Sequence, residues 1–462
     1  MSSTLRTAKF LACSYDGVWF MKIVIIGGTA AGTSAAAKAK RVDSSLEVVL
    51  LEKSPHLSVG ACGIPYALAG LTTLESLVAR SPKKFIEQGV DVRLHHEAVQ
   101  LEVDKGTVEI FNHSSKTTYQ ESFDCLIIAT GARAIRPNIE GVNLENVFTI
   151  RGMDDALGLA KVLPTAKRVV VVGAGYLGLE FVETCVALNI PVTLVQRSSR
   201  VLSDFGETFS EQALAELQRN NVEVMLETEV RGLEGTSHVT HVITNKGSLE
   251  ADVVIFGIGV QPNSELAARA GIRLSAFNSI HNDEKMRTNL EHVYAAGDVT
   301  DVFNRVSQRH EYLPIGTTAN KQGRVAGANV AGEHDTFKGV VGTAILKLFD
   351  LGFARTGLTV LQAKASGVEA TSTLVTSKDR AGYYPGAKPI LVEIIYSPTN
   401  GKLLGANFVG DVESVKRVDV VAALLHMEAT VEDLARLDLA YAPPFAPVWD
   451  SLLIAANRAR KD

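Results

Sequence analysis

The chain has 462 residues, of which 46% are hydrophobic and 21% are charged, and its formal net charge is −5. This length suffices for about three domains, each with its own core. The mild acidic balance, without any basic block, excludes a nucleic-acid partner bound by phosphate neutralisation. Four cysteines in so long a chain exclude a secreted disulfide framework and favour a reducing cytoplasm.

The sequence also gives no sign of a membrane segment or of a secretory leader. The longest apolar stretch, 169–188, is interrupted by Glu180 and Glu183. The first 20 residues lack the continuous apolar core of a signal peptide. We therefore expect a cytoplasmic protein without a membrane partner, in which residues 1–20 form an extension outside the fold.

The first predicted unit, residues 22–52, runs from β-branched residues through a glycine turn into an alanine-rich helix and a second apolar strand. This order is typical of a βαβ unit in a parallel sheet. Its outer glycines and the free N–H groups of the following helix favour a dinucleotide pyrophosphate, and the acid that ends the second strand suits ribose hydroxyls. The cofactor-binding residues expected here are Gly27, Gly28, Thr29, Ala30, Ala31, Gly32, Glu52 and Lys53.

A second unit, residues 168–196, repeats this order with a complete glycine fingerprint. The counterpart of the acid in the first unit is Gln196, which Arg197 and Arg200 follow. A neutral residue and two arginines favour the 2′-phosphate of NADPH, whereas a solvated turn with surface arginines accepts NADH equally well. The cofactor-binding residues expected here are Gly173, Gly175, Tyr176, Gly178, Gln196 and Arg197.

Later apolar segments, 251–263 and 292–300, are predicted as strands that return to the first domain. From about Gly339, strands and helices follow without a glycine fingerprint, which indicates an interface domain. We predict an α/β fold with two Rossmann-like domains, the second inserted in the first, and a C-terminal α+β dimerisation domain. Two dinucleotide folds in one chain imply two dinucleotides, and a flavin and a nicotinamide are the natural pair. The expected divisions are an extension (1–20), an FAD-binding domain in two parts (21–150 and 263–338), an NAD(P)-binding domain (151–262) and a dimerisation domain (339–462).

Three motifs make the chain similar to the pyridine nucleotide–disulfide oxidoreductase superfamily: ATGARAIRP (129–137), GIGVQPN (257–263) and YAAGDV (294–299). The resemblance covers about residues 21–460 and implies FAD in the first domain and NADPH or NADH in the second. In that family the last motif places an aspartate on the ribityl chain of the flavin, which here is Asp298. The other cofactor-binding residues implied are Ala129, Thr130, Gly131 and Gly259.

Cys62 is the expected catalytic residue. Ordinary members of that superfamily carry two cysteines separated by four residues, but Ala67 stands at the second position here. A redox cysteine without such a partner takes its second sulfur or oxygen from outside the chain. Pro65 and the apolar run after it predict a helix start, whose N-terminus lowers the pKa of the thiol. Cys125 and Cys185, in contrast, read as small core residues.

The single-cysteine branch of that superfamily includes reductases of coenzyme A disulfide and of persulfides, and also NADH oxidases and peroxidases. Oxidases and peroxidases usually carry a histidine in the first glycine turn, where this chain has Ala30. The reductases carry YYPG and AYAPPF motifs, and both occur here, with Tyr383 and Tyr441. The resemblance implies a homodimer with shared active sites, in which these two catalytic tyrosines reach Cys62 across the interface.

Five residues match the coenzyme A contacts of these reductases: Ser34, Lys38, Arg41, Ser58 and His310. Lys38 and Arg41 share one helix face and can meet the phosphates of an ADP moiety, although a solvated helix face explains them equally. Two positions depart from the pattern, since Arg380 replaces a histidine and a C-terminal lysine is missing around Trp449. The histidines show no metal-ligand spacing, so no metal site is expected.

Together these features predict an FAD-dependent enzyme that passes electrons from NAD(P)H to Cys62. Its expected substrate is coenzyme A disulfide or a related small-molecule disulfide or persulfide, with coenzyme A as substrate or bound thiol. One alternative is an NADH oxidase or peroxidase that cycles Cys62 through sulfenic acid and reduces oxygen or hydrogen peroxide. The other is a non-enzymatic redox sensor that only holds FAD.

Overall fold

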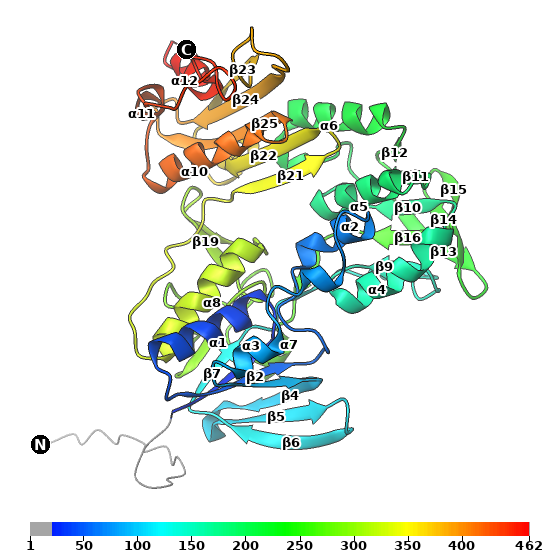
Figure 1. The fold of residues 1–462 in the computed structure, drawn as a ribbon, viewed down its shortest axis with the longest axis vertical. Helices are drawn as coiled ribbons and strands as arrows, with labels where there is room; N and C mark the ends of the chain where they lie inside the picture. The colour runs from blue at the N-terminus through cyan, green and yellow to red at the C-terminus, as the bar shows by residue number, and fades with distance from the viewer. Residues whose placement is uncertain (1–20, 462) are drawn as a thin grey trace, which may run out of the picture.

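The computed structural model describes residues 21–461, which form three sheet-based parts of an elongated molecule (Figure 1). The C-terminal part lies at one end, the first domain lies at the other, and the second domain lies beside them. The predicted extension 1–20 falls outside the described residues. Within 21–461, no helix is both long and apolar enough to cross a membrane.

The first domain is built on a parallel sheet in the order β18-β7-β1-β2-β3. Alternate residues of its strands face opposite layers, as strand geometry requires. Ile23 and Ile25 pack under helices, whereas Val24 and Ile26 pack against a second, antiparallel sheet, β4-β5-β6. Burial on both faces explains the continuous apolar runs in the sequence. The bounds are β1 (Lys22–Ile26), α1 (Ala30–Val42), β2 (Glu47–Glu52), α2 (Ile64–Leu68), α3 (Pro82–Ile86), β3 (Val90–Leu94), β4 (His96–Glu102), β5 (Thr107–Asn112), β6 (Thr117–Ser122), β7 (Cys125–Ile128), β18 (Val293–Ala295) and α8 (Gly316–Val330).

Helices α1 and α8 lie side by side on this sheet (Figure 1). A Cβ atom on Gly323 would lie 2.2 Å from the carbonyl oxygen of Ala31, and one on Gly327 would lie 2.3 Å from that of Ala35. The two helices can therefore approach only because small residues line both of them. This contact accounts for the alanine-rich sequence after the first glycine turn.

The second domain repeats the design with the sheet order β12-β11-β10-β16-β9. Val169 and Val171 face its helices, and Val170 and Val172 face the antiparallel sheet β13-β14-β15. The bounds are β9 (Val147–Thr149), α4 (Met153–Val162), β10 (Val169–Val172), α5 (Tyr176–Ala187), β11 (Val192–Val195), α6 (Glu207–Arg219), β12 (Glu223–Met225), β13 (Val230–Gly235), β14 (Val239–Thr244), β15 (Gly247–Glu250) and β16 (Val253–Phe256).

One strand assignment from the sequence is wrong. The segment 251–263 does not return to the first sheet as a whole, because β16 pairs in parallel with β10 of the second sheet. Only its end, β17 (Val260–Pro262), leaves and pairs with β8 (Ala132–Ala134). A strand buried on both faces has the same apolar pattern in either sheet, so the pattern did not reveal which sheet it joins. The next predicted strand, β18, does join the first sheet.

The C-terminal part contains an antiparallel sheet in the order β21-β22-β25-β24-β23. Helices α10 and α12 pack on it around a core that includes Phe408, Val421 and Leu452. The remaining bounds are α7 (Glu265–Arg269), β19 (Val302–Asn304), β20 (Arg309–Glu311), β21 (Ala344–Leu348), β22 (Leu351–Gly357), α9 (Val360–Ala365), β23 (Thr371–Lys378), β24 (Pro389–Tyr396), β25 (Leu403–Asp411), α10 (Val418–His426), α11 (Val431–Ala435) and α12 (Ser451–Ala459).

Candidate active site

The first glycine turn joins β1 to α1 and leaves no room for larger residues at its outer positions. Gly27 has φ +110°, and a Cβ atom there would lie 2.1 Å from the carbonyl oxygen of Ala129. A Cβ atom on Gly32 would lie 1.8 Å from the carbonyl oxygen of Gly27. Thr29, between them, has φ −99°, which any residue can adopt. The middle glycine of the fingerprint is therefore dispensable in this turn.

The predicted counterparts Glu52 and Gln196 make the same backbone contact. The carboxylate of Glu52 accepts hydrogen bonds from the N–H groups of Gly28, at 2.8 Å, and Ser54, at 2.9 Å. In the second domain, Oε1 of Gln196 accepts from the N–H of Ala174 at 3.1 Å. Each side chain is thus anchored at the end of a strand beside its own glycine turn. Exposed Arg197 follows Gln196, where an adenosine 2′-phosphate would be met.

Both turns fit a dinucleotide. Helix α5 begins directly after Gly175, and a Cβ atom on that glycine would meet no atom within 4 Å. Open space at a helix N-terminus, where backbone N–H groups lack partners, suits a pyrophosphate. The residues of the first turn would hold FAD and those of the second turn NAD(P)H. The nearby Tyr176 ring lies 6.0 Å from that of Phe205, and burial raises the pKa of its hydroxyl to about 12.

The predicted residues 129–131 and Gly259 lie where the chain crosses between the two domains. The hydroxyl of Thr130 donates to the backbone carbonyl oxygen of Asn263 at 2.8 Å. The side-chain amide of Asn263 donates in return to the backbone carbonyl oxygen of Thr130 at 2.9 Å. Gly131 and Gly259 both have positive φ, +64° and +107°. The two crossings are thereby held as one unit beside the first glycine turn.

Asp298, the predicted flavin contact, forms an ion pair with Arg151. The hydroxyl of Tyr312 donates to the backbone carbonyl of Asp298 at 2.8 Å, and Nε of Arg151 donates to the carbonyl oxygen of Ala132 at 3.0 Å. Arg151 and Tyr312 were not among the residues expected from the sequence. A sequence signal for Arg151 is absent, because its partner lies 147 residues away.

Cys62 lies between the two dinucleotide folds and is exposed on the single protomer. It sits in a short 3₁₀ turn, Ala61–Gly63, immediately before α2. Helix α2 is docked on α5 of the second domain, since the hydroxyl of Thr184 donates to the carbonyl oxygen of Pro65 at 3.1 Å (Figure 1). The thiol is therefore held at the contact between the first domain and the nicotinamide-binding fold.

On the single protomer the net shift of the Cys62 thiol pKa is upward, opposite to the direction expected from a helix N-terminus. The surrounding protein raises the pKa of the thiol by desolvation, and the charge of Glu180 raises it further. Arg151 acts in the opposite direction. Helix α2, which begins two residues after Cys62, has only five residues. Thiolate formation at Cys62 consequently depends on the groups brought against it.

Glu180 and Tyr66 form a second titratable pair beside Cys62. The hydroxyl of Tyr66 donates to Oε1 of Glu180 at 3.2 Å. Burial raises the pKa of Glu180 to about 7, and the Tyr66 hydrogen bond lowers it less than burial raises it. A carboxyl group that titrates near neutrality can hold and release a proton here. The sequence signal for this residue is a glutamate in the apolar helix that follows the second glycine turn.

The structure brings the two predicted tyrosines together. The hydroxyl oxygens of Tyr383 and Tyr441 are 3.4 Å apart although 58 residues separate them in sequence. They are 76% and 47% exposed, and neighbouring Phe445 and Trp449 are 77% and 61% exposed. Among residues 21–461, neither tyrosine is hydrogen-bonded to Cys62 of its own chain. This exposed aromatic surface suits an interface between subunits.

The residues expected to bind coenzyme A lie in several environments. Ser34 donates to Oδ1 of Asn320 at 2.7 Å. The backbone N–H of Ser58 donates to the carbonyl of Gly28, next to the first turn, at 2.8 Å. Lys38 forms an ion pair with Glu333 at 2.6 Å. His310 lies on β20, with Nδ1 3.2 Å from Oδ1 of Asp301.

Arg41, also expected to bind coenzyme A, is exposed on α1 and lies near Arg80, a residue that was not expected. Burial and the charge of Arg41 together lower the pKa of Arg80. No carboxylate among residues 21–461 forms an ion pair with either guanidinium. Two cations close enough to influence each other electrostatically, without an acidic partner, suit a phosphorylated ligand.

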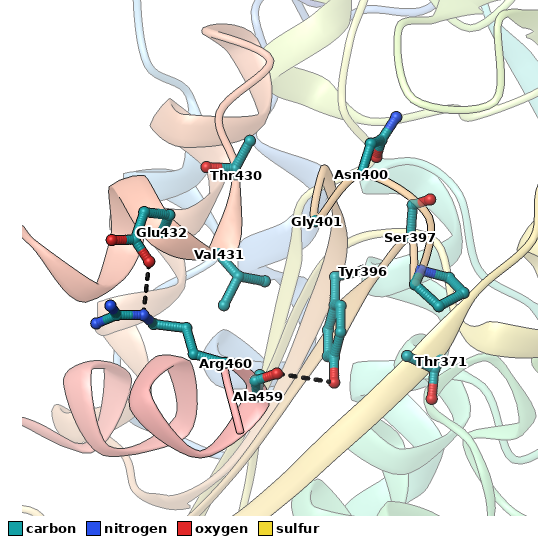
Figure 2. A pocket seen from close by; sticks show the side chains of 11 residues that line it. Thr371, Tyr396, Ser397, Asn400, Gly401, Thr430, Val431, Glu432, Ala459 and Arg460 are labelled. Atoms are coloured by element: carbon teal, nitrogen blue, oxygen red, sulfur yellow. Dashed lines mark hydrogen bonds and ion pairs between the residues drawn. The ribbon is translucent and has the colours of Figure 1, made fainter. Parts of the chain in front are cut away.

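A pocket of about 410 Å³ in the C-terminal part contains none of the predicted site residues. Figure 2 shows Tyr396 and Thr371 on one side and the Glu432–Arg460 ion pair on the other. The hydroxyl of Tyr396 donates to the carbonyl oxygen of Ala459 at 3.5 Å, and Nε of Arg460 lies 2.5 Å from Glu432. These side chains are engaged with one another, so the pocket adds no redox or nucleophilic group to the site around Cys62.

Comparisons with known proteins agree with this geometry. Residues 21–331 match the family model of pyridine nucleotide-disulphide oxidoreductases, and residues 343–452 match the dimerisation domain of that family. The NAD(P)H coenzyme A polysulfide/persulfide reductase of Pyrococcus horikoshii is 38% identical over 439 residues, covering 94% of this chain and 98% of that protein. The NADH oxidase of Methanocaldococcus jannaschii is 30% identical over 446 residues, covering 96% and 99%. The solved structure of an NAD-dependent persulfide reductase from A. fulgidus superposes with a TM-score of 0.92 at 34% identity, covering 96% of this chain and 83% of that one.

Proposed function

Since the chain belongs to the pyridine nucleotide-disulphide oxidoreductase family, we propose that it reduces the sulfur–sulfur bond of coenzyme A disulfide or of a coenzyme A persulfide through Cys62. The α/β fold and the family resemblance expected from the motifs are confirmed, and the chain is a flavin-dependent NAD(P)H oxidoreductase. The observation that carries the proposal is an exposed, unpaired Cys62 between two dinucleotide folds.

When bound, FAD and NAD(P)H would supply the two electrons needed to reduce the sulfur–sulfur bond. Cys62 attacks one sulfur of the substrate as a thiolate, forms a mixed disulfide and expels the other sulfur as a thiol or, from a persulfide, as hydrosulfide. Two-electron reduction of the mixed disulfide then releases the bound thiol and restores Cys62. The guanidinium of Arg151 favours the charged form of Cys62. Glu180, with a pKa of about 7 and a hydrogen bond from Tyr66, can accept the thiol proton and return one to the leaving sulfur.

The C-terminal part supports an assembly with shared active sites. Residues 343–452 match a dimerisation domain, and Tyr383 and Tyr441 lie adjacent on an exposed aromatic surface. In a homodimer we place these hydroxyl groups at the sulfur of the partner subunit, where they can stabilise a thiolate by hydrogen bonding. The free thiols of Cys62, Cys125 and Cys185 support a reducing, cytoplasmic location.

The preferred substrate follows from charge. Arg41 and Arg80 form a cationic pair on the side of α1, and coenzyme A carries phosphates that such a pair binds. One related protein is named an NADH oxidase, which favours oxygen reduction as the second candidate function. Ala30 argues against it, because a methyl group in the first turn cannot hydrogen-bond to a sulfenic acid.

Two measurements test the proposal. Mass spectrometry of the native protein should find coenzyme A bound through Cys62, and anaerobic turnover with coenzyme A disulfide should release two thiols for each NAD(P)H oxidised. Rapid NAD(P)H oxidation by oxygen alone, with no thiol release from the disulfide, would instead establish the oxidase function. Bound FAD without turnover of any acceptor would make the chain a redox sensor.

A further inference from the structure

We propose that His281, Asp301 and His310 form a binding site for a divalent transition-metal ion, for which Zn²⁺ is best suited. The three residues come from separate segments, so no ligand spacing marks them in the sequence. In the fold, one potential ligand atom from each lies within 4.8 Å of the other two. Two imidazole nitrogens and one carboxylate oxygen are a donor set that Zn²⁺ takes in three-ligand sites.

The backbone positions these three side chains before any ion binds. A parallel bridge pairs Ile280 with Thr300, and the N–H of Asp301 donates to the carbonyl oxygen of Ile280 at 3.3 Å. His281 is thereby set beside Asp301. Antiparallel pairing of β19 with β20, in which Phe303 lies opposite His310, returns the second histidine to the same place.

The two histidine–aspartate distances match those around a tetrahedral ion. Nδ1 of His281 lies 3.4 Å from Oδ2 of Asp301, and Nδ1 of His310 lies 3.2 Å from Oδ1 of Asp301. Zinc–ligand bonds of about 2.0–2.1 Å place the ligand atoms of a tetrahedron roughly 3.3 Å apart. A small rotation of the Asp301 carboxylate would therefore direct one oxygen and both nitrogens at a common point.

Burial and charge favour a cation at this point. The Asp301 side chain is only 1% exposed, and within 21–461 no lysine or arginine forms an ion pair with it. A buried carboxylate is costly unless a charge or strong donors compensate it. The histidines are 41% and 40% exposed, which leaves a route for the ion and a fourth position for water.

The site lies next to the segment that carries Asp298. Asp301 follows Asp298 by three residues, and His310 precedes Tyr312, which donates to the Asp298 carbonyl, by two. A bound ion would tie the β19–β20 hairpin to that segment and stabilise it. It would also engage the Nδ1 atom of His310, the residue expected from the sequence to contact coenzyme A.

The test is Zn²⁺ titration of the metal-stripped, FAD-loaded full chain by calorimetry, with Cys62→Ser as the parent to remove a competing thiol. We expect the parent to bind one Zn²⁺ per chain. Each of His281→Ala, His310→Ala and Asp301→Asn should bind Zn²⁺ at least about tenfold more weakly than the parent. His238→Ala, immediately before β14 of the second domain, is the matched control. Zn²⁺ should also raise the melting temperature of the parent but not of the three variants.

Three results would overturn the proposal. These are no stoichiometric binding to the parent, equal binding by the parent and the histidine variants, or equal losses in the His238→Ala control. If Asp301→Asn does not fold, the two histidine variants decide the question alone, because their side chains are exposed at the site.

Discussion

Tyr66 donates a hydrogen bond of 3.2 Å to Glu180, which links the helix after Cys62 to the helix after the second glycine turn. Because the partly buried carboxyl of Glu180 has a pKa of about 7, its charge changes near neutral pH. Above that pH the carboxylate opposes ionisation of the Cys62 thiol, and below it the opposition disappears. The reactivity of the cysteine is thus coupled to a residue of the other dinucleotide fold.

Glu180→Gln should lower the pKa of the Cys62 thiol, because the substitution removes the neighbouring negative charge that raises it. The pH dependence of iodoacetamide alkylation of the reduced, coenzyme A-free protein measures this pKa. We expect faster alkylation than in the parent above pH 7 and about the same rate well below it. Glu97→Gln, on β4, is the control, and an unchanged alkylation profile in Glu180→Gln would contradict the coupling.

Cys62→Ser should abolish reduction of coenzyme A disulfide while FAD stays bound and is still reduced by NAD(P)H. The flavin-binding residues lie in the first glycine turn and around Asp298, whereas attack on sulfur requires a thiolate. Anaerobic flavin bleaching and thiol release measure the two steps separately. Cys125→Ser, which alters a cysteine in strand β7, is the control. Near-normal thiol release by Cys62→Ser would show that another group is the nucleophile.

Arg197→Ala should raise the KM for NADPH more than the KM for NADH. A well-formed charge-assisted contact to a phosphate contributes roughly 1.5–3 kcal/mol, so we expect a selective effect of about tenfold or more. Steady-state kinetics with both cofactors provide the comparison. Arg231→Ala, an exposed arginine on β13, controls for the loss of surface charge. Equal changes in both KM values would make Arg197 an ordinary surface residue.

Arg41→Ala should raise the KM for coenzyme A disulfide but not the KM for pantethine. Pantethine is the disulfide of pantetheine and lacks the phosphorylated adenosine part. The reason is that Arg41 and Arg80 are adjacent cations with no acidic partner among the described residues. We expect an increase of about tenfold in the KM for coenzyme A disulfide alone. A similar increase for both disulfides would place the phosphates elsewhere.

Mixed dimers should reveal whether active sites are shared. A Cys62→Ser chain and a chain with both Tyr383→Phe and Tyr441→Phe, each poorly active alone, should recover activity when they exchange subunits. In a heterodimer one site would combine the intact cysteine with both tyrosines, and the other site would have neither. Activity in heterodimers isolated with two affinity tags measures this recovery. If verified heterodimers stay inactive, the tyrosines do not act across the interface.

Local sequence was sufficient for the two dinucleotide folds and for the family. Gly27 and Gly173 both have positive φ, a backbone conformation that favours glycine whatever surrounds it, so a short glycine motif predicts both turns. The absence of a second cysteine near Cys62 also indicated an external sulfur or oxygen partner. These inferences were possible because each depends on residues close together in the chain.

Other features were decided only by the tertiary structure. The Tyr66–Glu180 and Arg151–Asp298 contacts join residues 114 and 147 positions apart, and His281, Asp301 and His310 meet through strand pairing. The upward shift of the Cys62 thiol pKa has the same origin, since desolvation by the surrounding protein and the charge of Glu180 both raise it. Desolvation and Coulomb interactions depend on distance in space, and only the packing of the domains sets that distance.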